Sequence, residues 1–114
     1  MIKVRIIRSP GGVVQDISVS GHANQGPYGY DIVCAAVSAL AETLVIGLTQ
    51  VAPVAMEHHL NEGILTITLQ EYPSERTQAL LETFCLGLQD LAYSEPKFVK
   101  YGESVADREL ERRN

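Results

Sequence analysis

Residues 21–38 have the sequence GHANQGPYGYDIVCAAVS. This stretch begins where an alternating pattern of apolar and polar residues ends, and it finishes inside a strongly apolar helical pattern. Between the two patterns the sequence predicts a loop of about ten residues, which is long for a small domain. Loops of that length are usually functional or disordered. His22 lies at the start of this loop and Cys34 follows its end, so the pair is the first candidate for a functional site.

Two hairpins are predicted on either side of the long loop and its helix. Residues 2–8 and 13–20 alternate apolar with polar side chains, and residues 9–12 between them have the turn sequence SPGG. They therefore predict an antiparallel hairpin. The same pattern in residues 54–60 and 64–70 predicts a second hairpin around an Asn-Glu-Gly turn.

Two helices are also predicted. Asp31 is interpreted as the N-cap of the first, which runs to about Gln50 and is stopped by Pro53. This helix is apolar nearly all round, so it must be covered on more than one side, either by a curved sheet or in part by a second subunit. Ser74 is interpreted as the cap of the second helix, which reaches about Tyr93. Its buried stripe is formed by Leu80, Leu81, Phe84, Cys85, Leu88 and Leu91.

The element order β-β-α-β-β-α predicts a two-layer α+β domain, with a mainly antiparallel sheet and two helices packed on it. Residues 98–101 can add a short strand after the second helix. We assign residues 1–102 to one domain and residues 103–114 to a charged C-terminal tail that frays or forms a loose helix.

Composition and charge narrow the function classes. The chain has 114 residues, of which 46% are hydrophobic and 20% charged, as in a single soluble globular domain. A net charge of -5 argues against direct binding to nucleic acid or to an anionic membrane. The longest apolar run, residues 32–41, is too short to span a bilayer. The N-terminus lacks the apolar core of a signal peptide, so we expect a cytoplasmic protein with reduced cysteines.

No metal or cofactor site is predicted. The two cysteines, Cys34 and Cys85, are far apart in sequence and form no Cys-x-x-Cys motif. His58 and His59 are neighbours on a predicted strand, so their side chains point to opposite faces. Cys85 lies on the apolar stripe of the second helix and is interpreted as a buried residue.

Cys34 and His22 have the chemistry of a nucleophile and its base. A cysteine thiol has a pKa of about 8.5, so most of it is protonated at neutral pH. A helix N-terminus lowers that pKa by less than about one unit, whereas a contacting imidazolium lowers it by several. His22 can supply the imidazolium and then protonate a leaving amine. Residue chemistry alone leaves open that Cys34 is a packed core residue and His22 a surface residue.

Four further residues are candidates for supporting roles. Asp31 either caps the helix or orients His22 as a third member of a triad-like set. Ser38 follows Cys34 by four residues, so its hydroxyl donates to the thiolate or substrate, or bonds the carbonyl one turn back. Tyr28 and Tyr30 either stack on an aromatic substrate side chain or are surface residues of the loop.

The sequence resembles a known family, the ribosomal-processing cysteine proteases called Prp. The resemblance rests on Gly-His-Ala at 21–23, Gly29, and Asp-x-Val-Cys-Ala-x-Val-Ser at 31–38, and it covers nearly the whole chain in length and element order. It implies a bacterial cysteine endopeptidase that removes the N-terminal extension of large-subunit ribosomal protein number twenty-seven before ribosome assembly. The implied cut follows a short apolar segment that ends in an aromatic residue.

The resemblance also implies the roles of individual residues. Cys34 is the nucleophile of a Cys-His dyad and His22 its general base, while Gly21 and Gly29 are hinges of the loop. Family members are similar in forming homodimers, which fits the all-round apolar first helix. We expect His22 to lie far from Cys34 without substrate and to approach when a peptide orders the loop. The supporting residues implied by the resemblance are Asp31 and Ser38.

Two other classes of function remain open. A non-catalytic dimeric module of ribosome biogenesis would bind an extended peptide in the same groove, and it would keep all its activity in Cys34→Ala. A thiol redox or acyl-transfer protein would use Cys34 without cleaving a peptide. The redox version is weakened because Cys85, the second cysteine, belongs to another helix and is not a nearby resolving thiol.

Overall fold

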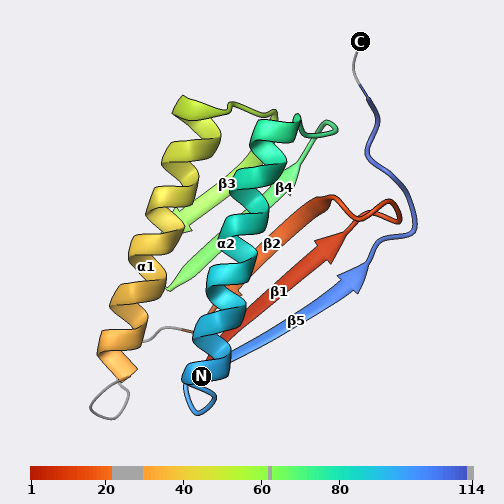
Figure 1. The fold of residues 1–114 in the computed structure, drawn as a ribbon. Coiled ribbons are helices and arrows are strands. Elements are labelled where there is room, and N and C mark those ends of the chain that lie inside the picture. Colours follow the sequence, from red (N-terminus) through yellow and green to blue (C-terminus); the bar gives the residue numbers. More distant parts are fainter. Residues whose placement is uncertain (22–29, 62, 113–114) are drawn as a thin grey trace.

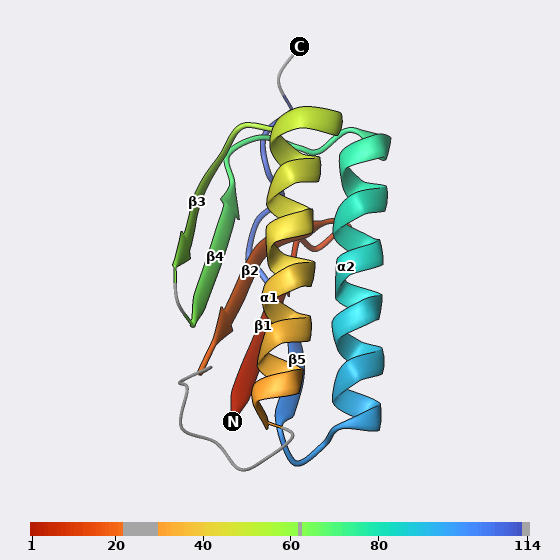
Figure 2. The same cartoon turned by 90° about the vertical axis from the view of Figure 1, so that its left-hand side faces the viewer.

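The computed structural model describes residues 1–21, 30–61 and 63–112. Both helices cover the same face of one sheet (Figure 1), and the view from the side shows the two layers (Figure 2). The predicted α+β fold is therefore confirmed. The elements formed by these residues are β1 (Ile2–Arg8), β2 (Val14–Ser20), α1 (Tyr30–Ile46), β3 (Met56–Asn61), β4 (Ile64–Leu69), α2 (Glu75–Ser94) and β5 (Val99–Val105), with a π-helical turn at Gly47–Val51 that continues α1.

The sheet has the strand order β3-β4-β2-β1-β5. The two predicted hairpins form β1 with β2 and β3 with β4, and β2 also pairs antiparallel with β4. In the centre, Ile6 lies opposite Ile17, which in turn lies opposite Ile67. All three side chains are buried beneath the helices, whereas the alternate residues Lys3 and Arg5 are exposed on the open face. The period of two in the sequence thus selects the face that the helices cover.

The second helix forms as predicted. The Oγ atom of Ser74 accepts a hydrogen bond from the backbone N–H of Thr77 at 3.1 Å, which satisfies one of the free donors at the start of α2. The helix ends at Ser94, close to the predicted end. Its buried stripe against the sheet consists of Leu81, Phe84, Cys85 and Leu88, so the predicted burial of Cys85 is confirmed.

The first helix has two apolar sides. One side is buried against the sheet and α2, and the other exposes Ile32, Leu40 and Ile46, whose exposed fractions are 63%, 38% and 51%. The predicted all-round apolar character is therefore seen in the structure, and one side lacks cover within the described chain. The buried side consists of Val33, Val37, Ala41, Leu44 and Leu48.

The helical segment Asp31–Val51 is long and apolar enough, by length and composition, to cross a membrane, with a mean hydropathy of 2.0. It is longer than the apolar run of residues 32–41 because it begins at Asp31 and continues past Glu42 to Val51. The core helix of an α+β domain passes the same test, since a buried face and an apolar outer face add to the same average. Its packing against the sheet (Figure 2) gives this segment the position of a core helix.

The C-terminal segment differs from the prediction. β5 extends to Val105 and pairs in parallel with β1, so it is longer than the short strand predicted at 98–101. The expectation that residues 103–114 fray or form a loose helix is wrong for 103–112. The backbone N–H of Ala106 donates to the carbonyl of Arg8 at 2.7 Å, and the N–H of Tyr72 donates to the carbonyl of Glu111 at 3.0 Å. These hydrogen bonds hold an irregular segment in a defined position. The sequence of this segment has no hydrophobic periodicity, so its position could not be predicted from the sequence pattern.

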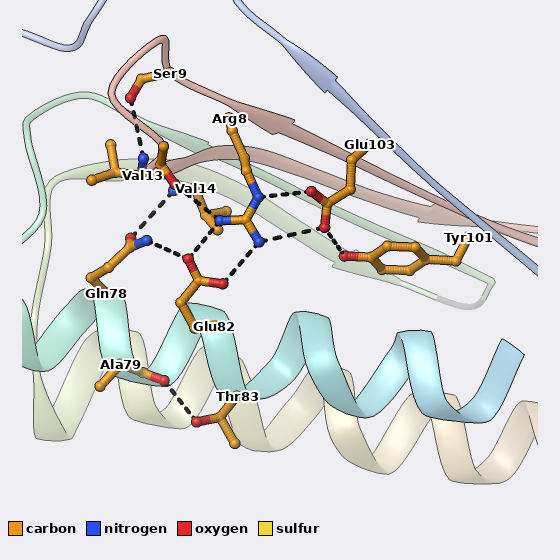
Figure 3. A network of polar contacts seen from close by, with 11 residues as sticks. Arg8, Ser9, Val13, Val14, Gln78, Ala79, Glu82, Thr83, Tyr101 and Glu103 are labelled. Atoms are coloured by element: carbon orange, nitrogen blue, oxygen red, sulfur yellow. Dashed lines mark hydrogen bonds and ion pairs between the residues drawn. The ribbon is translucent and has the colours of Figure 1, made fainter. Parts of the chain in front are cut away.

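A network of charged groups joins β1, β5 and α2 (Figure 3). The guanidinium of Arg8 donates to both carboxylate oxygens of Glu82, at 2.5 and 2.8 Å, and to Glu103 at 2.8 Å. The hydroxyl of Tyr101 donates to the same Glu103 carboxylate, and Gln78 donates to Glu82 at 2.7 Å. Hydrogen bonds from Arg8, and then from Tyr101, lower the pKa of Glu103. Burial, followed by the bond to Glu103, raises the pKa of Tyr101.

Replacing Arg8 with alanine is expected to lower the free energy of unfolding by about 2 kcal/mol, because two partly buried carboxylates lose their shared donor. Urea unfolding measures the loss. Arg5→Ala is the control, since Arg5 lies exposed on the same strand, and it should change stability by less than about 0.5 kcal/mol. Equal losses in the two variants would show that the network does not stabilise the fold.

The pH dependence of the same measurement tests the charge of Glu103. Its pKa in the folded protein lies below the unfolded value of about 4.3. The contribution of Glu103 is therefore complete above that value and is lost as the pH falls through the folded pKa. Glu103→Gln should show a shallower loss of stability in this acid range than the wild type.

Candidate functional site

Cys34 lies near the N-terminal end of α1, on the side of the helix that faces the sheet. The helix begins at Tyr30, so Asp31 lies inside its first turn and is not the N-cap that the sequence predicts. Cys34 consequently lies at the start of the second turn, two residues further from the helix start than predicted. The field of a helix terminus falls off within the first turn, so its help to a Cys34 thiolate is smaller than the sequence suggests.

The Cys34 side chain is buried, with 8% of its surface exposed, and it belongs to the hydrophobic core cluster. It does not form a disulfide with Cys85. Burial is the leading cause that raises the pKa of Cys85, to about 11, so the thiol of Cys85 is almost wholly protonated at neutral pH. Cys85 is therefore a packing residue, and Cys34 is the cysteine to consider as a nucleophile.

A groove lies between α1 and the tip of the β3–β4 hairpin, and Cys34 is not among the residues that line it. Its volume is ≈ 340 Å³. It starts at Ser38, one helical turn after Cys34, and its helix wall ends at Glu42. The hairpin wall includes two apolar side chains, Leu60 and Ile64, which are 40% and 47% exposed. A partly apolar surface that can hold part of a peptide therefore lies one helical turn from a cysteine.

Gly21 directly follows β2, at the end of the sheet where Ile64 lines the groove. Its φ angle is +99°, in the region that favours glycine. A Cβ atom added there would lie closer to the carbonyl oxygen of Met1 than van der Waals contact permits. The chain at position 21 therefore requires glycine for two independent reasons, namely its backbone angle and the close approach of β1. Whether Gly21 also acts as a hinge remains a prediction.

Several predicted site residues lie outside the described residues, namely His22, Tyr28 and Gly29. Their place in the site stays a prediction from the sequence. Tyr30 is the first residue of α1, and Asp31 is exposed in its first turn. Ser38 lines the groove, and its predicted hydrogen bond to the thiolate or the substrate stays a prediction.

Other polar residues do not form a second site within the described ranges. His58 and His59 are consecutive residues of the edge strand β3, both exposed, and the register places their side chains on opposite faces. Among the residues described in the structure, no group of three histidine, cysteine or acidic side chains is arranged to hold a metal ion.

Sequence reasoning missed the groove. Leu60 and Ile64 are read from the sequence as ordinary strand residues, and Glu42 as the charge that ends an apolar run. The available signal was that both apolar residues flank the turn of an edge hairpin, where few neighbours can cover them.

The chain is similar to known proteins over most of its length. A family model described as cysteine protease Prp matches residues 1–100. The chain is 35% identical over 94 residues to the ribosomal processing cysteine protease Prp of Staphylococcus aureus, which covers 80% of this chain and 88% of that protein.

Two solved structures of the protease Prp from S. aureus are similar in fold. One, in complex with a covalently linked product peptide, has a TM-score of 0.80 and 27% identity. The other, in complex with a substrate peptide, has a TM-score of 0.78 and 25% identity. Each alignment covers 90% of this chain and 99% of the other.

Proposed function

The chain belongs to the Prp family of cysteine proteases, and from this membership we propose that it removes the N-terminal extension of a large-subunit ribosomal protein, number twenty-seven, before ribosome assembly. The observation that carries the proposal is the position of Cys34 near the start of α1, one helical turn before a partly apolar groove. A relative named as a ribosomal processing protease, and its complex with a covalently linked product peptide, support a peptide substrate for this chain.

In the proposed reaction Cys34 and His22 act as a dyad. The imidazole of His22 takes the thiol proton, and the Cys34 sulfur attacks the scissile carbonyl carbon. The C–N bond then breaks, and the leaving amine takes the proton from His22. Water, deprotonated by His22, hydrolyses the thioester and restores the thiol. His22 follows Gly21 directly, so the fixed end of β2 sets where the segment that carries the base begins.

Asp31 and Ser38 have supporting roles in this proposal. Asp31 lies one turn before Cys34, where a carboxylate opposes thiolate formation but stabilises an imidazolium. It is therefore assigned to the orientation of His22. Ser38 lines the groove and is assigned to a contact with the substrate backbone next to the scissile bond.

We also propose that the protein is a homodimer, supported by the exposed side of α1. Ile32, Leu40 and Ile46 lie on one stripe of the helix, and small residues between them allow close approach of a second helix. This stripe is distinct from the side that bears Cys34 and the groove. A dimer formed through it leaves the groove open to a peptide.

The proposed function is tested with a synthetic peptide that spans the junction between extension and mature ribosomal protein. The wild-type protein should cut it once, at the junction, and mass spectrometry of the two products identifies the bond. His22→Ala should leave the peptide intact. A peptide that binds to both proteins and is cut by neither would instead favour a non-catalytic peptide-binding module.

A further inference from the structure

The groove beside Cys34 has a charged end, and this inference rests on the function proposed above. Its helix wall runs from Ser38 through Ala41 to Glu42, and its opposite wall carries Leu60 and Ile64. The charge of Glu42 is the feature that the proposed reaction does not use. Glu42 follows Cys34 by eight residues, so it lies just over two helical turns further along α1 and is rotated about 80° from Cys34 around the helix axis.

Glu42 has no ion-pair partner among the described residues, in which both ion pairs are made by Arg8. Its side chain is exposed to solvent. A single negative charge beside exposed apolar side chains forms a surface that attracts a cation attached to an apolar chain. Lysine and arginine side chains have this chemistry, because their aliphatic stems pack on apolar surface while the charge remains in contact with water.

We infer that the groove binds the extended substrate and that Glu42 recognises a lysine or arginine three or four residues from the scissile bond. The spacing follows from the rise per residue of an α-helix and the length per residue of an extended peptide. Eight residues of α-helix span about 12 Å between Cys34 and Glu42. An extended peptide covers that distance in about three to four residues. The substrate is thereby defined as a peptide with a basic residue at a fixed distance from the cut.

The test is a charge exchange between protein and peptide. Junction peptides carry lysine or glutamate at the third or fourth residue from the cut, on either side. At one position the wild type should cleave the lysine peptide about tenfold more efficiently in kcat/KM than the glutamate peptide, mainly through KM. Glu42→Lys should reverse this preference, and added salt should weaken it in both proteins.

Asp90→Lys is the matched control, because it makes the same charge change at an exposed position of α2, outside the groove. It should keep the wild-type preference. Binding of the same peptides to Cys34→Ala, followed by fluorescence anisotropy, gives a readout that does not depend on cleavage. Equal kcat/KM and equal binding for all peptides, or the same preference in Glu42→Lys as in the wild type, would overturn the role of Glu42. Absence of cleavage together with charge-selective binding would contradict the proposed protease and uphold the recognition.

Discussion

Cys34→Ala is expected to abolish peptide cleavage, by at least about 1,000-fold in kcat, while the protein remains folded. In the proposed reaction the sulfur forms the covalent intermediate. The other described thiol cannot replace it, because Cys85 is buried between α2 and the sheet. The stability cost should be small, about 1 kcal/mol, since one buried atom is removed. Cleavage of the junction peptide and thermal unfolding are measured on the same preparation.

Cys85→Ala is the matched control for this result. Its side chain is 1% exposed, and its thiol pKa is raised to about 11, so it contributes packing and no nucleophile. The variant should lose about 1–2 kcal/mol of stability and retain the wild-type kcat. Cleavage that survives in Cys34→Ala would mean that the nucleophile is assigned to the wrong residue.

Gly21→Ala is expected to lower the free energy of unfolding by about 2–3 kcal/mol, which corresponds to a fall of about 10 °C in Tm. The alanine would have to keep a positive φ angle and would press its Cβ against the backbone carbonyl of Met1. Because that oxygen belongs to the backbone, no side-chain rotation relieves the contact. The start of β1 or the end of β2 must move, and His22 moves with it. Cleavage should therefore fall even at temperatures where the variant is folded.

Gly102→Ala provides the control for the Gly21 result. A Cβ at position 102 meets no atom within 4 Å, and the residue does not have a positive φ angle. Its substitution in β5 should leave Tm within a few degrees of the wild type and leave cleavage unchanged. If Gly21→Ala behaves like Gly102→Ala, the strand end tolerates a side chain and the close approach to Met1 is relieved at no cost.

The parts of the fold that were predictable depend on local chemistry. The alternating pattern of the first two strands and the Ser74 cap depend only on residues that are close in sequence, and both are confirmed. The start of α1 was predicted two residues too late because Asp31 favours a helix both as an N-cap and within the first turn. Cys34 and Ser38 are candidates because of their spacing and surroundings in the sequence, and their roles remain predictions.

The rest depends on contacts between distant segments. The full length of β5 is stabilised by β1, and the segment after it is held by Arg8 and Tyr72, which local patterns do not reveal. The groove likewise forms only because the edge hairpin lies beside α1. The position of Glu42 in a groove could therefore not be predicted from the sequence around it. Contacts between segments that are distant in sequence could therefore not be predicted from local patterns.

The parallel pairing of β1 with β5 has a consequence for the synthesis of the protein. Ile2 pairs with Val99, so the first strand to be made is completed only by the last. Such contacts close a very long loop and are formed late in folding. During translation β1 lacks this neighbour, and Arg8 lacks Glu103, until the C-terminal strand has been made. We expect a nascent chain to remain incompletely folded until β5 has been made, so that proteolytic activity begins only after that point.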